Sequence, residues 1–294
     1  MGKTSALTRL KKTSISVKDI ASQLWCEKQM ELFITTGGYT TPAMEKGSAM
    51  HNNLQAQVFK ALPIEPISYG DRLFKWAFET YTSISNIYKE GYARELKIYG
   101  SINGFKVSGQ IDELRIQDNK LIIVEDKTIK NDNKGSVISL RFDADKLQAN
   151  IYGLLLGDIK NKNYTFDNFA NSFGIDKLNM SKEFLSGLDS LGLKKENQDL
   201  SRIYKLMFDS YVSLPALSDL IKIRYMDRET KSIISELDIK YSKDEVSKDL
   251  VSLMGYWSGD REAMPVPEDK KWRCKYCKFF GNKCTTWWVG EQTK

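Results

Sequence analysis

The sequence has few of the residues that most often bind metals or close disulfides. Among its 294 residues there are one histidine and four cysteines. We expect no signal peptide, so an extracellular disulfide framework is not favoured. Three of the cysteines follow the spacing C-x2-C-x6-C, which indicates metal ligation by thiolates. We therefore expect an intracellular protein, although the sequence does not distinguish cytoplasm, nucleus and mitochondrion.

Long apolar runs and a strong charge of one sign are lacking as well. No run approaches the roughly 18 apolar residues of a membrane-spanning helix, so we expect no membrane association. The formal net charge of +6 permits a polyanionic partner without requiring one. Hydrophobic residues make up 41% of the chain, which is typical of a globular protein, and the length fits one elaborated domain.

The stretch between residues 107 and 130 predicts a β-hairpin that carries acidic and basic side chains. Two runs rich in Val, Ile and Leu flank a polar turn at residues 117–120. Because side chains alternate along a strand, Glu125 and Lys127 share one face, and Asp112 on the preceding strand can lie across from them. An isolated E-x-K triplet is most often solvated surface charge, so the rest of the chain has to decide its role.

These residues have the chemistry of a divalent-cation site. Asp112 and Glu125 offer hard oxygen ligands for Mg²⁺ or Mn²⁺, and His51, the one histidine, can add a nitrogen. A bound cation polarises a phosphate oxygen, and Lys127 can neutralise charge that develops on the phosphate. The set therefore predicts phosphodiester hydrolysis without a covalent intermediate.

Hydrophobic periodicity outlines the remaining elements. It predicts helices at residues 16–33, 43–61, 70–92, 143–157 and 243–257, a strand at 93–99 and a strand pair at 217–241. Cys26 falls in the middle of the first predicted helix. Gln148 and Tyr152 are four residues apart on another and should lie one above the other. The aromatic residues of 70–92 indicate core packing.

The four cysteines admit two metal sites. Cys26, Cys274, Cys277 and Cys284 could hold a structural zinc ion or an iron–sulfur cluster, and their spacing alone does not separate the two. Either site would join the N-terminal helix to the C-terminal tail. Reduced thiols with no common role are the remaining alternative.

Taken in order, the motifs resemble the RecB-like branch of the PD-(D/E)XK nucleases and, within it, the exonuclease V family of single-strand DNA exonucleases. The matching elements are Cys26, G-x-x-x-H ending at His51, G-x-I-D ending at Asp112, Glu125-Asp126-Lys127, Gln148-x-x-x-Tyr152 and the C-terminal cysteine triplet. Three longer stretches carry the closer likeness: ISVKDIASQLWCEKQME, DLIKIRYMDRETKSII and GYWSGDREAMPVPEDKKWRCKYCKFF.

The resemblance implies an α/β fold with a restriction-endonuclease-like core, a central mixed sheet flanked by helices and helical elaborations. It implies a 4Fe–4S cluster on the four cysteines. It also implies that His51, Asp112, Glu125 and the carbonyl of Asp126 bind Mg²⁺ or Mn²⁺. Lys127 would assist catalysis, while Gln148 and Tyr152 would position the phosphate or Lys127. A free single-stranded end would thread through a narrow passage.

The same resemblance divides the chain into regions. It implies one nuclease domain at 15–294, with its core at about 93–157. The basic residues and lack of acids at 1–14 separately predict a flexible basic N-terminus. The iron–sulfur region would combine 15–33 with 257–288, and 158–200 would be a variable insertion. The partner is single-stranded DNA in repair or processing, a single-strand-binding protein is a candidate partner, and we expect a monomer.

Several residues are candidates for contact with the strand. They are the basic stretches 127–134 and 270–278 for the backbone, and Trp76, Tyr81 or Trp272 for stacking on bases. Two other functions stay open. One is a CRISPR-associated RecB-like nuclease in spacer processing, and the other is a non-catalytic single-strand-binding module on the same scaffold.

Overall fold

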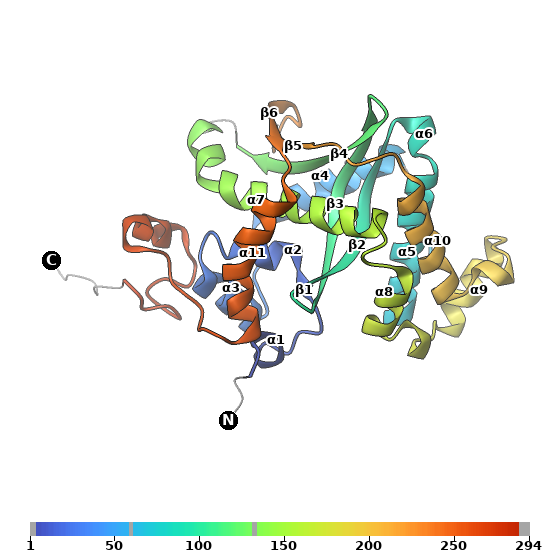
Figure 1. The fold of residues 1–294 in the computed structure, drawn as a ribbon, viewed down its shortest axis with the longest axis horizontal. Coiled ribbons are helices and arrows are strands. Elements are labelled where there is room, and N and C mark those ends of the chain that lie inside the picture. Colours follow the sequence, from blue (N-terminus) through green and yellow to red (C-terminus); the bar gives the residue numbers. More distant parts are fainter. Residues whose placement is uncertain (1–3, 59–60, 131–133, 288–294) are drawn as a thin grey trace.

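The computed structural model describes residues 4–58, 61–130 and 134–287, and one mixed sheet forms its centre (Figure 1). The strands are β1 (Ile15–Ser16), β2 (Tyr92–Ile102), β3 (Phe105–Gln117), β4 (Lys120–Ile129), β5 (Leu220–Asp227) and β6 (Ile233–Lys240). They follow the order β1-β3-β4-β5-β6, and β2 also pairs with β3. The β1–β3 and β4–β5 pairs are parallel and the others antiparallel. This confirms the predicted α/β class with a central mixed sheet.

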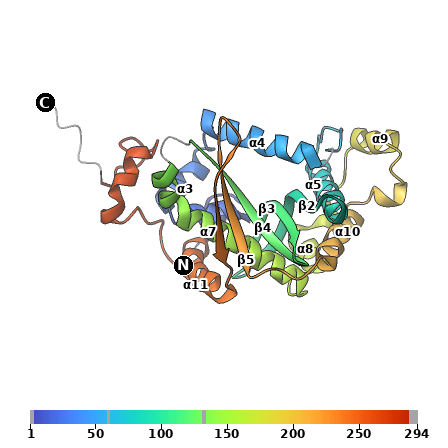
Figure 2. The ribbon, with the colours of Figure 1, turned by 90° about the horizontal axis from the view of Figure 1, so that it is seen from above.

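Helices surround this sheet. They are α1 (Ala6–Arg9), α2 (Val17–Ser22), α3 (Glu27–Thr35), α4 (Pro42–Val58), α5 (Tyr69–Ser85), α6 (Ile87–Glu90), α7 (Lys134–Lys160), α8 (Phe166–Phe173), α9 (Lys182–Ser190), α10 (Leu200–Ser213) and α11 (Lys243–Ser258), with short 3-10 turns η2 (Ile175–Lys177), η3 (Lys195–Asn197) and η4 (Glu268–Tyr276). Figures 1 and 2 together show α7 and α4 on opposite sides of the strands. None of the described helices has the length and apolar character needed to cross a membrane.

Two tight turns set the register of the central strands. β2 and β3 meet at Asn103-Gly104, and β3 and β4 meet at Asp118-Asn119, with positive φ at all four residues. Such two-residue turns match the right-handed twist of the strands that they join. The predicted hairpin at 107–130 and its turn are therefore confirmed, and the turns fix which side chains meet across the sheet.

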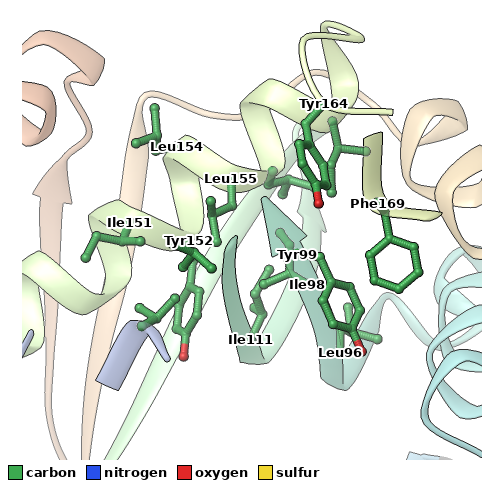
Figure 3. Packing of buried hydrophobic residues seen from close by; sticks show 14 of the residues in the cluster. Leu96, Ile98, Tyr99, Ile111, Ile151, Tyr152, Leu154, Leu155, Tyr164 and Phe169 are labelled. Carbon is green, nitrogen blue, oxygen red and sulfur yellow. The ribbon is translucent and has the colours of Figure 1, made fainter. Parts of the chain in front are cut away.

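Helix α7 packs its apolar side on β2, β4 and β5 (Figure 3). It begins at Lys134, well before the predicted start at residue 143. Lys134, the last residue of the basic stretch 127–134, is thus helical, and 131–133 lie outside the described residues. The contact is close at Gly109, where an added Cβ would lie 2.5 Å from Cε1 of Tyr152. Glycine at this position therefore lets Tyr152 approach the strand.

The predicted N-terminal helix is wrong in one respect. Residues 16–33 form two helices instead of one, and a capping box of Ser16 and Asp19 begins α2. Cys26 is the N-cap of α3, with extended backbone, and its Sγ accepts a hydrogen bond from the backbone N–H of Gln29. Cys26 therefore lies at the break between the two helices, whereas the sequence predicted it in the middle of one.

Residues 4–14 are the described part of the expected basic N-terminus, and they pack against the rest of the chain. They contain α1, which packs against α11, and both Ala6 and Leu10 are buried. Arg9, one of the basic residues of this segment, pairs with Glu31 at 3.1 Å and with Glu262 at 2.9 Å. The apolar residues Ala6 and Leu10, which lie among the charged residues, therefore anchor this segment to the core.

The expected insertion at 158–200 adds helices beside β2. Phe169 of α8 packs with Tyr99 of β2 and Tyr204 of α10, at ring-centroid distances of 4.6 and 4.4 Å (Figure 3). At its other end, Asp71 of α5 accepts hydrogen bonds from both the backbone and the hydroxyl of Ser181, which begins α9. These contacts make the region part of the packed structure.

Candidate active site

The site lies where the pairing of β3 with β4 stops. The ladder ends at the pair Glu113 and Val124. Beyond it the Asp112 side chain takes over, because its Oδ2 accepts a hydrogen bond at 2.8 Å from the backbone N–H of Asp126. Asp112 therefore lies beside Glu125, as the hairpin predicted.

Lys127 is held at the centre of a buried polar group. Its Nζ donates to Glu125 Oε1 at 2.7 Å and to Gln148 Oε1 at 2.9 Å. The amide nitrogen of Gln148 also lies 2.6 Å from Glu125 Oε1 and 3.3 Å from the hydroxyl of Tyr152. The structure thus brings together the sequence-predicted residues of the hairpin and of α7.

Asp145 joins this group and was missed from the sequence. Its carboxylate accepts a hydrogen bond from the Tyr225 hydroxyl at 3.0 Å and lies 3.6 Å from Lys127 Nζ and 3.6 Å from Arg141. Burial lowers the pKa of Lys127, but the charges of Glu125, Asp145 and Asp112 outweigh it and raise the pKa above its ordinary value. Lys127 therefore stays cationic.

His51 reaches the site from α4 and meets two carboxylates. Its Nδ1 lies 2.9 Å from Glu95 Oε1 and 3.4 Å from Asp112 Oδ1. Burial opposes the imidazolium, yet the hydrogen bond to Glu95 and the charge of Asp112 raise the pKa of His51. One ligand atom from each of these three residues lies within 4.8 Å of the others, which is close enough to share one cation.

Glu95 was also missed, although the sequence holds a signal for it. Asn103-Gly104 is the strongest short-range hairpin signal, and counting back from it places Glu95 opposite Asp112. The backbone of Glu95 has a φ of 54°, and the pairing of β2 with β3 skips Glu95 between Arg94 and Leu96. Its carboxylate is further held by the amide of Gln110, which in turn contacts Lys97.

The electrostatics of the site fit a bound divalent cation. Burial, together with the charge of Asp112, raises the pKa of Glu125 to about 8, and burial raises the pKa of Asp112 as well. The buried Oε2 of Glu125 has no hydrogen-bond partner among the described residues. A cation would give that oxygen a partner and favour the charged form of both acids.

Asp126 uses its side chain elsewhere. Its carboxylate accepts from Arg224 at 2.7 Å and from Arg94 at 2.5 Å, inside a buried network that includes Glu113. Burial opposes ionisation, but the two arginines lower the pKa of Asp126. Only the backbone carbonyl of Asp126 is thus left for the metal role that the resemblance implies.

A cleft of about 800 Å³ opens over the site. Its lining includes the candidate residues His51, Glu95, Asp112, Lys127, Asp145 and Gln148. Lys18, Arg141 and Arg228 add positive charge to the lining. Such a cleft can accept a polyanion whose phosphate reaches the acids and Lys127.

The sequence-predicted stacking residues are not in the described lining of this cleft. Trp76 is covered by the Lys97 ammonium, 4.6 Å from its ring centroid, and Trp272 packs edge-on against Trp25 at 6.0 Å. Tyr81 lies on α5 and contacts the core. The aromatic residues of the cleft are instead Trp25 and Tyr276.

The four cysteines line one pocket between α3 and the C-terminal segment. None of them, all within the described ranges, forms a disulfide. Burial raises the pKa of Cys26, and Cys277 and Cys284 add to the rise. Thiols fit a zinc ion or an iron–sulfur cluster by donor type, but no three of the described cysteines have their Sγ atoms within 4.8 Å of one another, so the structure identifies neither group.

Three comparisons with known proteins bear on this site. A family model described as "Exonuclease V - a 5' deoxyribonuclease" matches residues 5–134 and 192–288. The chain is 22% identical over 290 residues to Exonuclease V of Danio rerio, covering 94% of this chain and 71% of that relative. A solved structure titled "Crystal structure of SSO0001" covers 90% of this chain and 83% of that chain with 13% identity and a TM-score of 0.40, a likeness too weak to support an argument. The matched ranges include His51 and the whole hairpin, while α7 falls between them.

Proposed function

Because the chain belongs to the exonuclease V family, we propose that it is a metal-dependent exonuclease that hydrolyses single-stranded DNA from a free end. The observation that supports the proposal most is the placement of Lys127 between Glu125 and Gln148, at 2.7 and 2.9 Å, beside Asp112. A buried lysine with two acids at the floor of a cleft suits charge stabilisation during phosphodiester cleavage.

The metal would be held by His51, Asp112, Glu125 and the carbonyl of Asp126. Glu95 is a further candidate ligand, because it shares the cluster with His51 and Asp112. Mg²⁺ or Mn²⁺ bound there would supply Lewis-acid stabilisation of a phosphate oxygen.

The chain's own residues perform the other tasks. Lys127, kept cationic by its acidic neighbours, neutralises charge on the phosphate oxygens. Gln148 fixes both Lys127 and Glu125 through its amide, and Tyr152 supports Gln148 from one turn along α7. The cleft holds the strand, and Lys18, Arg141 and Arg228 in its lining can pair with the backbone phosphates.

The family description supports attack at a 5′ end of DNA. We extend this to single strands, because stacking and backbone contacts in one cleft suit an unpaired strand. A single-strand-binding protein is the partner that we propose for substrate delivery, and co-elution of the two with DNA would test it.

The four cysteines are proposed to hold a 4Fe–4S cluster. Their shared pocket supports a common group, and the motif order favours the cluster over zinc. Protein purified without air should be brown, absorb broadly near roughly 400 nm and contain about four iron atoms per chain. A colourless protein with one zinc ion would overturn the assignment.

Nuclease assays on single strands labelled at the 5′ or the 3′ end test the activity. We expect cleavage with Mg²⁺ or Mn²⁺, none with a chelator, and a loss of at least about 10³-fold in Asp112→Asn and Lys127→Ala. Asp209→Asn, an exposed acid on α10, is the matched control and should keep full activity. Wild-type turnover that persists in both active-site variants would contradict the proposal. Tight binding without turnover would support a non-catalytic binding module.

A further inference from the structure

The ring of Tyr276 protrudes from the cysteine-bearing segment into the cleft. Tyr276 is 73% exposed, the highest value among the exposed large apolar and aromatic side chains of the described residues. It also belongs to the lining of the same cleft as Asp112 and Lys127. An exposed aromatic side chain in a ligand cleft needs an explanation, because burial would stabilise it.

The base of this ring is fixed by other aromatic side chains. Tyr276 meets Trp272 edge-on at 6.3 Å, and Trp272 meets Trp25 edge-on at 6.0 Å. Trp25 lines both the cleft and the cysteine pocket, so this group of rings lies next to both. The exposed ring of Tyr276 is therefore attached to a group of packed aromatic side chains, Trp272 and Trp25.

Arg273 contacts both tryptophans of this group. Its guanidinium lies over the ring of Trp25 at 4.7 Å and of Trp272 at 5.6 Å. It also donates hydrogen bonds to the backbone carbonyls of Leu24 and Trp25, and only 8% of it is exposed. A buried cation between two rings, bonded to the backbone, leaves little freedom to the segment that carries Tyr276.

The rest of the lining identifies what the ring would meet. Lys18, Arg141 and Arg228 are suited to phosphates, whereas Trp25, Met44 and Tyr276 offer apolar faces in the same cleft. A ligand that combines negative charge with flat aromatic groups matches both features. Unpaired nucleic acid has this chemistry, since its bases are free to stack.

We propose that Tyr276 forms a stacking site for one base of the single strand whose phosphate lies at the catalytic residues. The proposal rests on the proposed exonuclease function and adds a base-binding position to it. Stacking on this ring holds the strand in the cleft without reading its sequence, because every base presents a flat face.

Binding measurements separate this role from a structural one. Fluorescence anisotropy with a labelled oligo-dT in a chelator, which stops cleavage, should show about tenfold weaker binding or more for Tyr276→Ala. Tyr276→Leu keeps the bulk but not the ring and should be equally weak, whereas Tyr276→Phe and Tyr276→Trp should bind like wild type. Tyr88→Ala, which removes a tyrosine 67% exposed on α6 and outside the cleft lining, is the control and should bind normally.

A series of strands with one abasic residue locates the base. Wild type should bind the abasic strand more weakly than the intact strand when the abasic residue occupies one position of the series. Tyr276→Ala should bind that abasic strand and the intact strand with equal affinity. Equal affinity of wild type and Tyr276→Ala, additive losses at every position, or a Tyr276→Phe as weak as Tyr276→Ala would each overturn the stacking site. Absence of wild-type cleavage would instead contradict the exonuclease itself, so the two failures are distinguishable. An unchanged melting temperature and metal content in Tyr276→Ala and Tyr276→Leu would show that the cysteine site is intact.

Discussion

At the residue scale, the site depends on acids that burial holds in an unfavourable environment. Glu125 is 1% exposed, and its Oε2 lacks a hydrogen-bond partner among the described residues. Its neighbour Lys127 offsets only part of this cost, so the pKa of Glu125 stays raised. A buried carboxylate of this kind binds a cation in competition with a proton.

We predict that Mg²⁺ binds more tightly as the pH rises. The pKa of metal-free Glu125 is about 8, so below that pH the group keeps a proton that Mg²⁺ has to displace. The raised pKa of His51 acts in the same direction. Affinity should rise by up to about tenfold per pH unit below pH 8 and level off above it, as measured by titration calorimetry. Glu125→Gln should remove most of this dependence; affinity independent of pH in wild type would contradict the prediction.

Asp145 is predicted to position Lys127 and to keep it charged. Asp145→Asn removes a charge that raises the pKa of Lys127, so kcat should fall about tenfold with KM little changed. The alkaline limb of the pH–rate profile should also move to lower pH. Tyr225→Phe removes a hydrogen bond of Asp145 but not its charge, so its alkaline limb should stay in place. The same shift in both variants would contradict the charge effect.

At the element scale, polar contacts fix how helices and strands meet. The hydroxyls of Thr80 and Ser83 on α5 accept hydrogen bonds from the backbone N–H groups of Lys97 and Arg94, which covers an edge of β2. Asp71 connects α5 to α9 in a comparable way. Such contacts satisfy backbone groups that would otherwise be buried without partners.

Asp71→Ala is predicted to destabilise the fold by about 2 kcal/mol, because it removes the capping-box partner of Ser68 and both bonds to Ser181. Although burial opposes ionisation, these hydrogen bonds lower the pKa of Asp71 to about 2 from 3.8. The stabilisation is thus complete above pH 3.8 and is lost as the pH falls towards 2. Urea unfolding at several pH values measures it. Glu183→Gln, an exposed first-turn acid on α9, should cost less than about 0.5 kcal/mol; an equal loss would contradict the capping role.

Arg224→Met is predicted to be more damaging, at about 3–5 kcal/mol, since it leaves Glu113 and Asp126 buried with one arginine fewer. The network joins β2, β3, β4 and β5 behind the site, so the loss should appear as global unfolding in urea. Arg115→Met, which removes a side chain 35% exposed that also pairs with Glu113, should cost about 1 kcal/mol or less. Similar costs for the two variants would show that the buried position of Arg224 is unimportant.

At the scale of the whole molecule, residues from the two ends of the chain come together beside the sheet (Figure 1). Trp257 donates a hydrogen bond to Gln23, and Arg261 pairs with Glu27 at 2.5 Å. The cysteine pocket lies at the same junction, with α3 on one side and the segment after η4 on the other. Trp25 and Tyr276 of this junction line the cleft, so the junction shapes the site as well as closing the fold.

Cys26→Ser is predicted to release the metal proposed for the cysteine pocket and to loosen this junction. Elemental analysis should show loss of more than half of the iron or zinc. Limited proteolysis should cut α2–α3 and residues 259–287 about tenfold faster than in wild type, because these segments would open locally. Glu262→Gln removes an exposed ion pair at the same junction and should change neither. Full metal content with unchanged proteolysis in Cys26→Ser would exclude the joining role.

Much of the hairpin was predictable from local rules. The turn at Asp118-Asn119, the capping box of Ser16 and the common face of Glu125 and Lys127 depend on residues within a few positions of one another. The register of β2, and with it Glu95, was available from Asn103-Gly104 but was missed. The break of the first helix at Cys26 was not available, since it depends on a pocket whose other walls lie near the far end of the sequence.

The sequence by itself determined the mixed α/β class, the family and the set of acids, lysine and cysteines, because residue type and short spacing specify chemistry and local periodicity. Tertiary structure decided which of these groups meet. It directed the carboxylate of Asp126 to the arginine network and brought Asp145 to Lys127. It also placed Tyr276 in the lining of the cleft, which includes neither Trp76 nor Trp272. These outcomes depend on contacts between elements distant in sequence, which periodicity within one element does not encode.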